Sequence, residues 1–145
     1  MSIVCSGSVA YDYLMSFPGY FREHILPDRL ESISLSFLVD NMVRQRGGTA
    51  PNIAYTLALL GERPQVLATV GEDFGEYRAW LESKGVDTAL TKVIPGTYTA
   101  SFFANTDRAN NQICSFYTGA MAHAASLSLR DLPAAPDLVI ISPND

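Results

Sequence analysis

Apolar positions along the chain gather in short runs that are separated by turn residues. Three of these runs have strand length: Val66–Val70 and Leu138–Ile141, which are almost continuously apolar, and Ile3–Ser8, which starts apolar and ends in Gly7-Ser8. Such runs are typical of strands that are buried on both faces of a parallel sheet. Between the first two runs, apolar residues recur at helical spacing over residues 53–60. The pattern therefore predicts strands alternating with helices, as in an α/β domain.

Turn and capping residues predict where the helices begin and end. Thr49 is suited to the N-cap of the first helix, and Gly61 to the position just after its end. A second helix is predicted over Glu76–Lys84, closed by Gly85. Each helix lies between apolar runs, which favours crossover connections in a parallel sheet.

A different pattern interrupts this alternation in two places. Short runs with strand character follow one another without an intervening helix: Ile33–Phe37, Met42–Arg46, Leu90–Ile94, Tyr98–Asn105 and Gln112–Tyr117. Successive strands favour antiparallel hairpins. We therefore predict a parallel α/β core with a small antiparallel sheet appended to it. The last run, Leu138–Ile141, would leave one face of the core sheet bare, so we expect the chain to be a fragment or that face to be covered by something else.

Composition narrows the function classes. The 145 residues suffice for one domain with a core, 48% of them are hydrophobic, and only 17% are charged. A net charge of −5 without a Lys/Arg cluster argues against nucleic-acid binding. The two cysteines, Cys5 and Cys114, have no metal-ligand spacing and are expected to be reduced, buried thiols of a cytoplasmic protein. No apolar run approaches the roughly 20 residues that span a membrane.

The strongest chemical signal is a pair of glycines that runs into the first helix. Gly47 and Gly48 lack a Cβ, so backbone there can approach a ligand closely. The helix N-terminus offers N–H groups and a partial positive charge, and Asn52 lies in its first turn. Asp12 follows the first strand by a few residues, and ligands of open α/β sheets collect beyond the carboxyl ends of strands. These residues predict a site for a small molecule with hydroxyl or anionic groups.

Taken singly, these residues also have ordinary structural explanations. Asp12 suits a surface turn, and Asn52 suits a capped or solvated helix position. Phe102 and Phe116 lie on neighbouring predicted strands, where they either pack the sheet or present rings to a flat ligand. Three further polar residues carry no signal alone: Ser8, Ser36 and Gln112. The sequence contains no Ser-His-Asp order, no Walker A motif and no complete G-x-G-x-x-G fingerprint.

Together, the motifs resemble the N-terminal half of a PfkB-family (ribokinase-like) kinase. The resemblance spans essentially all 145 residues and rests on four motifs in order: Gly7-Ser8 with Asp12, Gly47-Gly48 with Asn52, Val70-Gly71 with Asp73-Phe74-Gly75, and Gly85-Val86-Asp87-Thr88. Within that family the chain is most similar to actinobacterial-type adenosine kinases. The stretches that carry this similarity are Phe17-Pro18-Gly19, Ser34–Asp40, Arg46-Gly47-Gly48 and Ser115–Met121.

The resemblance implies an architecture and an activity. It implies that residues 1–145 form the N-terminal part of one Rossmann-like kinase domain, with lid strands over about 13–46 and 88–118 and the C-terminal ATP-binding part absent. It implies transfer of a phosphoryl group from ATP to the 5′-hydroxyl of a nucleoside, with adenosine as the expected substrate and Mg²⁺ as the metal. It also implies a homodimer that pairs through the β-sheet lid.

The resemblance also implies roles for individual residues. Asp12 matches the aspartate that holds sugar hydroxyls, and Gly47, Gly48 and Asn52 match the glycine-rich substrate motif. Ser8 and Ser36 match polar positions on the substrate side. Phe102 and Phe116 match lid aromatics that sandwich a purine, one of them supplied by the partner subunit in some arrangements. Gln112 is a weaker match on the substrate side.

Two departures from the family pattern bear on function. Ala10 stands two residues before the aspartate, where many sugar kinases of the family have Asn, and this argues against a plain ribokinase and is compatible with a nucleoside kinase. The Gly-Ala-Gly-Asp-type motif that carries the catalytic base does not occur in the chain, so we assign no catalytic residue and no metal ligand and expect the chain to be inactive alone. The alternatives are a PfkB kinase of a free sugar or sugar phosphate, and a non-catalytic module for nucleoside binding or dimerisation.

Overall fold

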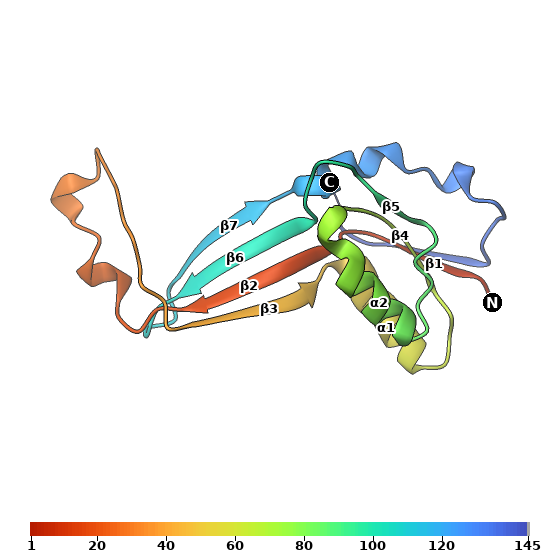
Figure 1. Cartoon of the computed structure of the whole chain (residues 1–145), viewed down its shortest axis with the longest axis horizontal. Helices are drawn as coiled ribbons and strands as arrows, with labels where there is room; N and C mark the ends of the chain where they lie inside the picture. The colour runs from red at the N-terminus through yellow and green to blue at the C-terminus, as the bar shows by residue number, and fades with distance from the viewer. Residues whose placement is uncertain (145) are drawn as a thin grey trace.

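The chain folds into a body built on one four-stranded sheet, from which a second four-stranded sheet projects (Figure 1). The architecture is that of a computed structural model, which describes residues 1–144. The strands are β1 (Ile3–Ser6), β2 (Ala10–Ser16), β3 (Asn41–Gly47), β4 (Gln65–Val70), β5 (Thr91–Val93), β6 (Ala100–Thr106), β7 (Gln112–Tyr117) and β8 (Leu138–Ile141). The α-helices are α1 (Thr49–Leu59) and α2 (Gly75–Ser83). Short 3₁₀ segments are η1 (Phe21–Glu23), η2 (Pro27–Arg29), η3 (Glu72–Phe74), η4 (Gly119–Ser126) and η5 (Leu129–Asp131).

The body is a parallel sheet with the strand order β5-β4-β1-β8. Helices α1 and α2 lie on one side of it and η4 lies on the other (Figure 1). Ala54 of α1 and Leu81 of α2 share one buried cluster with Cys5 of β1 and Val66 of β4. Strands β1 and β4 are therefore buried, as their apolar runs predict. Among the residues described, β8 is an edge strand and pairs with β1 alone. It is therefore less buried than predicted, and Ile141 is 74% exposed.

The projecting sheet has the order β3-β2-β6-β7 and is mixed, which corrects the antiparallel prediction. The pairs β2–β3 and β6–β7 are antiparallel, but the central pair β2–β6 is parallel. The reason is that β2 and β6 both run outward from the body, and each is followed by the strand that returns beside it (Figure 1). Two hairpins therefore lie side by side with their outgoing strands in contact.

The strand predicted over Leu90–Ile94 forms, but it belongs to the other sheet. Its core, β5, pairs parallel with β4 at the edge of the body. The projecting sheet therefore resumes only at β6, after the loop through Pro95 and Gly96. The strand itself was predictable from composition, whereas its pairing partner was not.

The strand predicted over Ile33–Phe37 is wrong. This segment is irregular and belongs to an arm, residues 17–40, beyond the far end of the projecting sheet (Figure 1). Ile33 is 59% exposed, and no neighbouring strand pairs with the segment among the residues described. Phe37 instead packs edge-on against the rings of Phe17 and Phe21, with centroids 5.1 and 4.8 Å away. Alternation of apolar and polar residues gives a strand only where another strand satisfies the backbone.

Of the two capping residues predicted for α1, only the one at its C-terminal end is confirmed. Gly61 follows the helix in the left-handed conformation, with φ +93°, as predicted. At the other end Gly48, and not Thr49, occupies the N-cap position. The hydroxyl of Thr49 is used elsewhere, donating to the carbonyl of Pro143 at 3.1 Å. The helix therefore starts against the loop that follows β8.

The predictions about the two cysteines, about membrane-spanning helices and about location have different outcomes. Cys5 is buried as predicted, and burial raises the pKa of its thiol, but Cys114 faces solvent on β7, which corrects the prediction of two buried thiols. Within residues 1–144, no helix combines the length and the apolar character that crossing a bilayer requires. A cytoplasmic location stays a prediction.

Candidate functional site

Three chain segments meet beyond the carboxyl ends of β1 and β8. The Ser8 N–H donates to the carbonyl of Pro143 at 2.9 Å, which joins the loop after β1 to the loop after β8. The hydroxyl of Ser142 donates to Thr49 Oγ1 at 2.9 Å, which adds the start of α1. This is the edge of an open parallel sheet at which ligands usually bind.

The paired glycines let the turn between β3 and α1 pass against this edge. A Cβ on Gly48 would lie 2.4 Å from the carbonyl oxygen of Ser8 and 2.6 Å from the Cα of Val9. A Cβ on Gly47 would lie 2.5 Å from Oδ2 of Asp12. The absence of both side chains therefore brings the turn into contact with the β1–β2 connection and places it directly beside the Asp12 carboxylate.

The first amides of α1 are already in use. The Thr49 N–H donates to Ser8 Oγ at 3.1 Å, and the Ala50 N–H donates to the Ser8 carbonyl at 3.2 Å. Pro51 has no N–H to offer. The first three helical residues thus leave no amide free for an anion, and polar recognition at this turn falls to side chains such as Asn52, which is exposed in the first turn.

Asp12 is the carboxylate nearest to this turn. It is half-buried on β2, and burial raises the pKa of its side chain above the ordinary value for aspartate. Within residues 1–144 its carboxylate accepts no hydrogen bond from another side chain or from the backbone, so its oxygens remain available as acceptors. A desolvated acceptor without a partner is suited to binding ligand hydroxyls.

The strand register puts two aromatic rings in line with Asp12. Asp12 pairs with Phe102, and Phe102 pairs with Phe116 on the next strand. Paired positions share one face of a sheet, so the carboxylate and both rings lie on the same face. Phe116 is 51% exposed and, with Ser8 and Met121, lines a cavity of about 150 Å³. The structure therefore brings together six of the residues predicted from sequence: Ser8, Asp12, Gly47, Gly48, Phe102 and Phe116.

Two residues predicted for the site lie away from this group. Gln112 is on the same face of the sheet but at its far end, where its side chain donates to Thr106 Oγ1 at 3.2 Å. Ser36 is exposed on the arm beyond that end (Figure 1). In this conformation neither side chain reaches the glycine turn.

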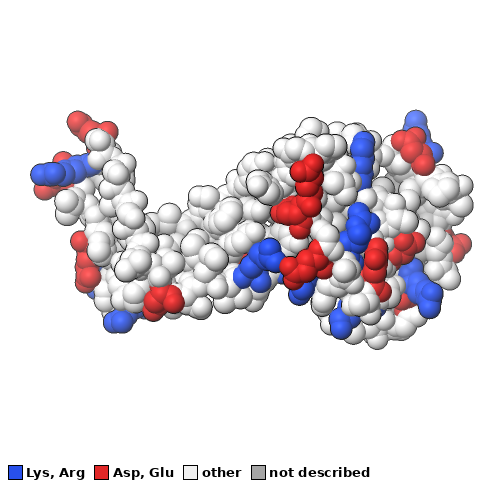
Figure 2. All heavy atoms as spheres, in the orientation of Figure 1, with Lys and Arg blue, Asp and Glu red and all other residues white. Residues whose placement is uncertain are grey.

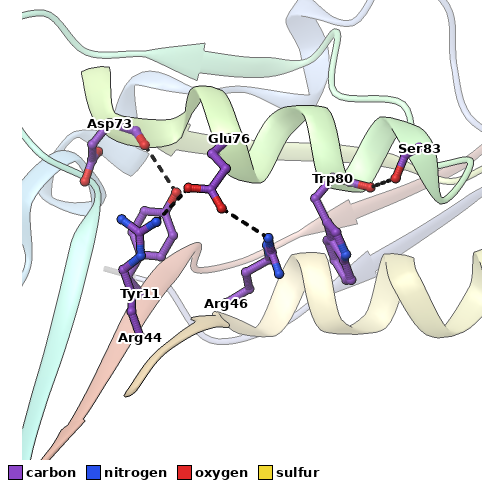
Figure 3. A network of polar contacts seen from close by, with 7 residues as sticks. All are labelled: Tyr11, Arg44, Arg46, Asp73, Glu76, Trp80 and Ser83. Atoms are coloured by element: carbon purple, nitrogen blue, oxygen red, sulfur yellow. Dashed lines mark hydrogen bonds and ion pairs between the residues drawn. The ribbon is translucent and has the colours of Figure 1, made fainter. Parts of the chain in front are cut away.

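The sequence reading missed a set of contacts that ties the projecting sheet to α2. Glu76 pairs with Arg44 at 2.7 Å and with Arg46 at 3.4 Å (Figure 3). The Tyr11 hydroxyl donates to the carbonyl of Asp73 at 3.2 Å (Figure 3). These partners lie 30 or more residues apart in the chain, and no local motif announces them.

A further missed contact reaches the glycine turn itself. The hydroxyl of Tyr77, on α2, donates to the carbonyl of Gly47 at 3.1 Å. The only local signal is that Tyr77 lies on the apolar side of α2, four residues before Leu81, and this indicates burial but not the hydrogen bond.

Charge is unevenly distributed over the molecule. On the face shown in Figure 2, charged side chains crowd the body, whereas the projecting sheet displays few. Among the residues described, no group of three or more His, Cys, Asp or Glu side chains converges as a metal ion would require. We therefore assign no residue of residues 1–144 to a metal.

Comparison with known proteins agrees with this architecture. The family model described as pfkB family carbohydrate kinase matches residues 9–143. A nucleoside kinase from Methanothermobacter thermautotrophicus is 32% identical over 120 residues, which is 81% of this chain and 36% of that protein. The chain therefore spans little more than a third of the length of this curated relative.

Solved structures of a nucleoside kinase from Burkholderia thailandensis are also similar. The ligand-free form is 40% identical with a TM-score of 0.83, covering 99% of this chain and 47% of that one. The complex with inosine has 38% identity and a TM-score of 0.75, and the complex with ADP-inosine has 40% identity and a TM-score of 0.70. Each complex covers 99% of this chain and 45% of the other. The arrangement of this chain is thus most similar to the ligand-free form among the three.

Proposed function

This chain belongs to the pfkB family of carbohydrate kinases, and from that premise we propose that it forms the nucleoside-binding part of an ATP-dependent nucleoside kinase. One observation carries the proposal. The Asp12 carboxylate, which has no hydrogen-bond partner within residues 1–144, lies in register with two aromatic rings, Phe102 and Phe116, beside the turn formed by Gly47 and Gly48. Hydroxyl acceptors next to stacking surfaces suit a ligand that has both a sugar and a flat base.

We propose that the ribose lies over the glycine turn. Asp12 accepts hydrogen bonds from the ribose hydroxyls, and Asn52 adds an amide that both donates and accepts. The missing side chains of Gly47 and Gly48 allow the sugar to approach the backbone. Ser8 supplies a hydroxyl at the rim of the cavity that Phe116 also lines. The occupied amides of α1 favour a hydroxyl ligand here over a phosphate.

We expect Phe116→Ala to weaken adenosine binding, because the ring stacks on the base. Base–aromatic stacking contributes about 1–3 kcal/mol, so affinity should fall roughly 5- to 150-fold. Stability should change little, since Phe116 is half-exposed. Phe103→Ala is the matched control, because Phe103 lies on the opposite face and stacks on Tyr13 with centroids 4.8 Å apart. Equal loss in the two variants by calorimetry would contradict the base site.

Adenosine affinity is expected to depend on the charge of Asp12. Burial raises the pKa of Asp12, so protonation begins at a higher pH than for an exposed aspartate. Affinity should be constant near neutral pH and fall as the pH is lowered through this pKa, because the acid form gives up part of its acceptor capacity. Calorimetry from about pH 8 down to about pH 4, near the ordinary pKa of an aspartate, measures this, with Asp12→Asn as the control that has no carboxyl to titrate. An acid limb that persists in Asp12→Asn would assign the titration to another group.

We propose that the projecting sheet is a lid over the nucleoside. The greater similarity to a ligand-free relative than to its inosine complex supports an open arrangement. Closure would bring Gln112 and Ser36, now distant, toward the bound nucleoside. The lid also exposes apolar side chains, including Met42, Val43 and Ile113, which supports the proposal that two copies pair through it as a homodimer.

The co-substrate proposed is ATP with Mg²⁺, in keeping with the family. When bound, the pair supplies the γ-phosphoryl group and the charge neutralisation that its transfer requires. The residues described here bind and orient the acceptor nucleoside. None of them is assigned as the base for the 5′-hydroxyl, and we derive no step through the metal.

A side-by-side phosphorylation assay on the full-length protein tests the proposal. Adenosine is the expected substrate on the resemblance to actinobacterial-type adenosine kinases, and inosine is the competing nucleoside because a similar kinase was solved with it. Ribose and fructose represent the sugar-kinase alternative. Turnover of a nucleoside well above either sugar supports the proposal, and the reverse order favours a sugar kinase. Nucleoside binding without turnover would indicate a non-catalytic module.

A further inference from the structure

We propose that Tyr77 is a positioning residue, whose hydroxyl holds the peptide of Gly47 and thereby fixes where the Asp12 carboxylate meets the ribose. The inference rests on the proposed nucleoside site and deepens it. Tyr77 touches no ligand in this scheme and acts only through the glycine turn.

Tyr77 is built into the core directly behind that turn. Its side chain is 1% exposed, and its hydroxyl donates to the Gly47 carbonyl at 3.1 Å. Its ring contacts the rings of Tyr11 and Phe74, with centroids 5.6 and 5.3 Å away. This close packing holds the hydroxyl toward the turn.

The hydroxyl remains a donor at every working pH. Burial is the largest cause that raises the pKa of Tyr77, and electrostatic interactions with Tyr11 and Asp12 raise it further, against a lowering effect of Arg46. The Gly47 carbonyl therefore has a permanent donor within the core.

Gly47 transmits this constraint to Asp12. Its missing Cβ would lie 2.5 Å from Oδ2 and 2.9 Å from Cγ of Asp12, so the carboxylate rests on the glycine itself. Gly47 has no side chain to anchor its peptide, and its position depends on pairing with Ala10 and on Tyr77. Loss of the hydroxyl would leave a buried carbonyl without its donor and free the surface on which the carboxylate rests.

The test compares adenosine with 2′,3′-dideoxyadenosine, which lacks the hydroxyls that Asp12 is proposed to bind. In the full-length protein, Tyr77→Phe should lower adenosine affinity about tenfold and leave the affinity for the dideoxy analogue within about twofold. In an Asp12→Asn background, Tyr77→Phe should have little further effect on adenosine, because the two changes act through one contact. Calorimetry gives the affinities, and its stoichiometry gives the folded fraction.

Two variants serve as matched controls. Tyr55→Phe removes a tyrosine hydroxyl from α1 whose ring packs on Trp80, with centroids 4.9 Å apart, away from the glycine turn. Glu76→Gln neutralises the residue next to Tyr77. Glu76 contacts β3 through its ion pairs with Arg44 and Arg46, whose side chains are exposed to solvent. Both variants should leave the preference for adenosine over the dideoxy analogue unchanged.

Equal weakening of both ligands by Tyr77→Phe, or an additive effect in the Asp12→Asn background, would overturn the inference and leave a structural role. Wild-type affinity in Tyr77→Phe would overturn it as well. If the wild-type protein binds no nucleoside, the proposed function fails separately, and hydrogen exchange still decides the positioning claim. Exchange over residues 47–50 should then be faster in Tyr77→Phe than in Tyr55→Phe, and equal rates would refute it.

Discussion

Asp12→Ala is expected to abolish hydroxyl-dependent binding of adenosine by the full-length protein. Hydrogen bonds to a charged group contribute about 1.5–3 kcal/mol each, so two ribose contacts correspond to roughly 10²- to 10⁴-fold in affinity. Asp12 is half-buried and has no partner within residues 1–144, so its removal takes no contact away from another described residue. Isothermal calorimetry measures the loss, and an unchanged affinity would refute the role given to Asp12.

Stability measurements separate this loss from misfolding. Burial raises the folded-state pKa of Asp12, so above that pKa the charge opposes folding, and the penalty is relieved as the pH falls through it. The near-isosteric Asp12→Asn should therefore melt at or above the wild-type temperature at neutral pH while binding adenosine poorly. Asp40→Asn removes an exposed carboxylate at the start of β3 and should change neither property. A lower melting temperature in Asp12→Asn would assign Asp12 a structural role.

Local signals were sufficient for most elements of the fold. The apolar run that became β4 and the helical spacing that became α1 are decided by neighbours within a few residues. The same holds for Gly61 and Gly85, whose positive φ ends the two helices. Where residues close in sequence decide the conformation, periodicity and turn chemistry predict it.

Pairing and burial were predicted less well because distant segments decide them. No local sequence pattern indicates that β2 and β6, which are far apart along the chain, lie side by side in parallel. No local pattern indicates either that β5 joins the sheet of the body or that β8 lies at the edge of that sheet. Ile33–Phe37 has the alternation of a strand but no strand beside it. Each error follows from treating a local pattern as if its partner were present.

The features of the candidate site fall into the same two groups, those that local sequence indicates and those that distant segments decide. Gly47 and Gly48 stand out in the sequence because only glycine tolerates such close approach of the chain. The register that aligns Asp12 with Phe102 and Phe116 depends on the pairing of β2, β6 and β7, which no local pattern predicted. The resemblance to a family assigned the three residues to one site but did not give this register. The contact from Tyr77 to the turn crosses 30 residues and has no local signature.

We expect Gly48→Ala to destabilise the protein strongly. Gly48 has φ +95°, which L-residues rarely adopt, and this strain alone costs about 1–3 kcal/mol. An added Cβ would also lie 2.4 Å from the carbonyl of Ser8 and 2.6 Å from Cα of Val9, both backbone atoms that cannot turn aside. We expect strain and clash together to lower the free energy of unfolding by on the order of 3–5 kcal/mol, as measured by urea denaturation.

Gly61→Ala isolates the contribution of contact from that of strain. Gly61 has nearly the same φ, +93°, but its Cβ would meet no atom within 4 Å. The Gly61→Ala substitution should therefore lower the free energy of unfolding by only about 1 kcal/mol or slightly more. The difference between the two variants measures how closely the turn between β3 and α1 is pressed against the β1–β2 connection. Equal destabilisation would mean that the turn moves aside freely, and the glycine pair could then not hold Asp12 in place for the ribose.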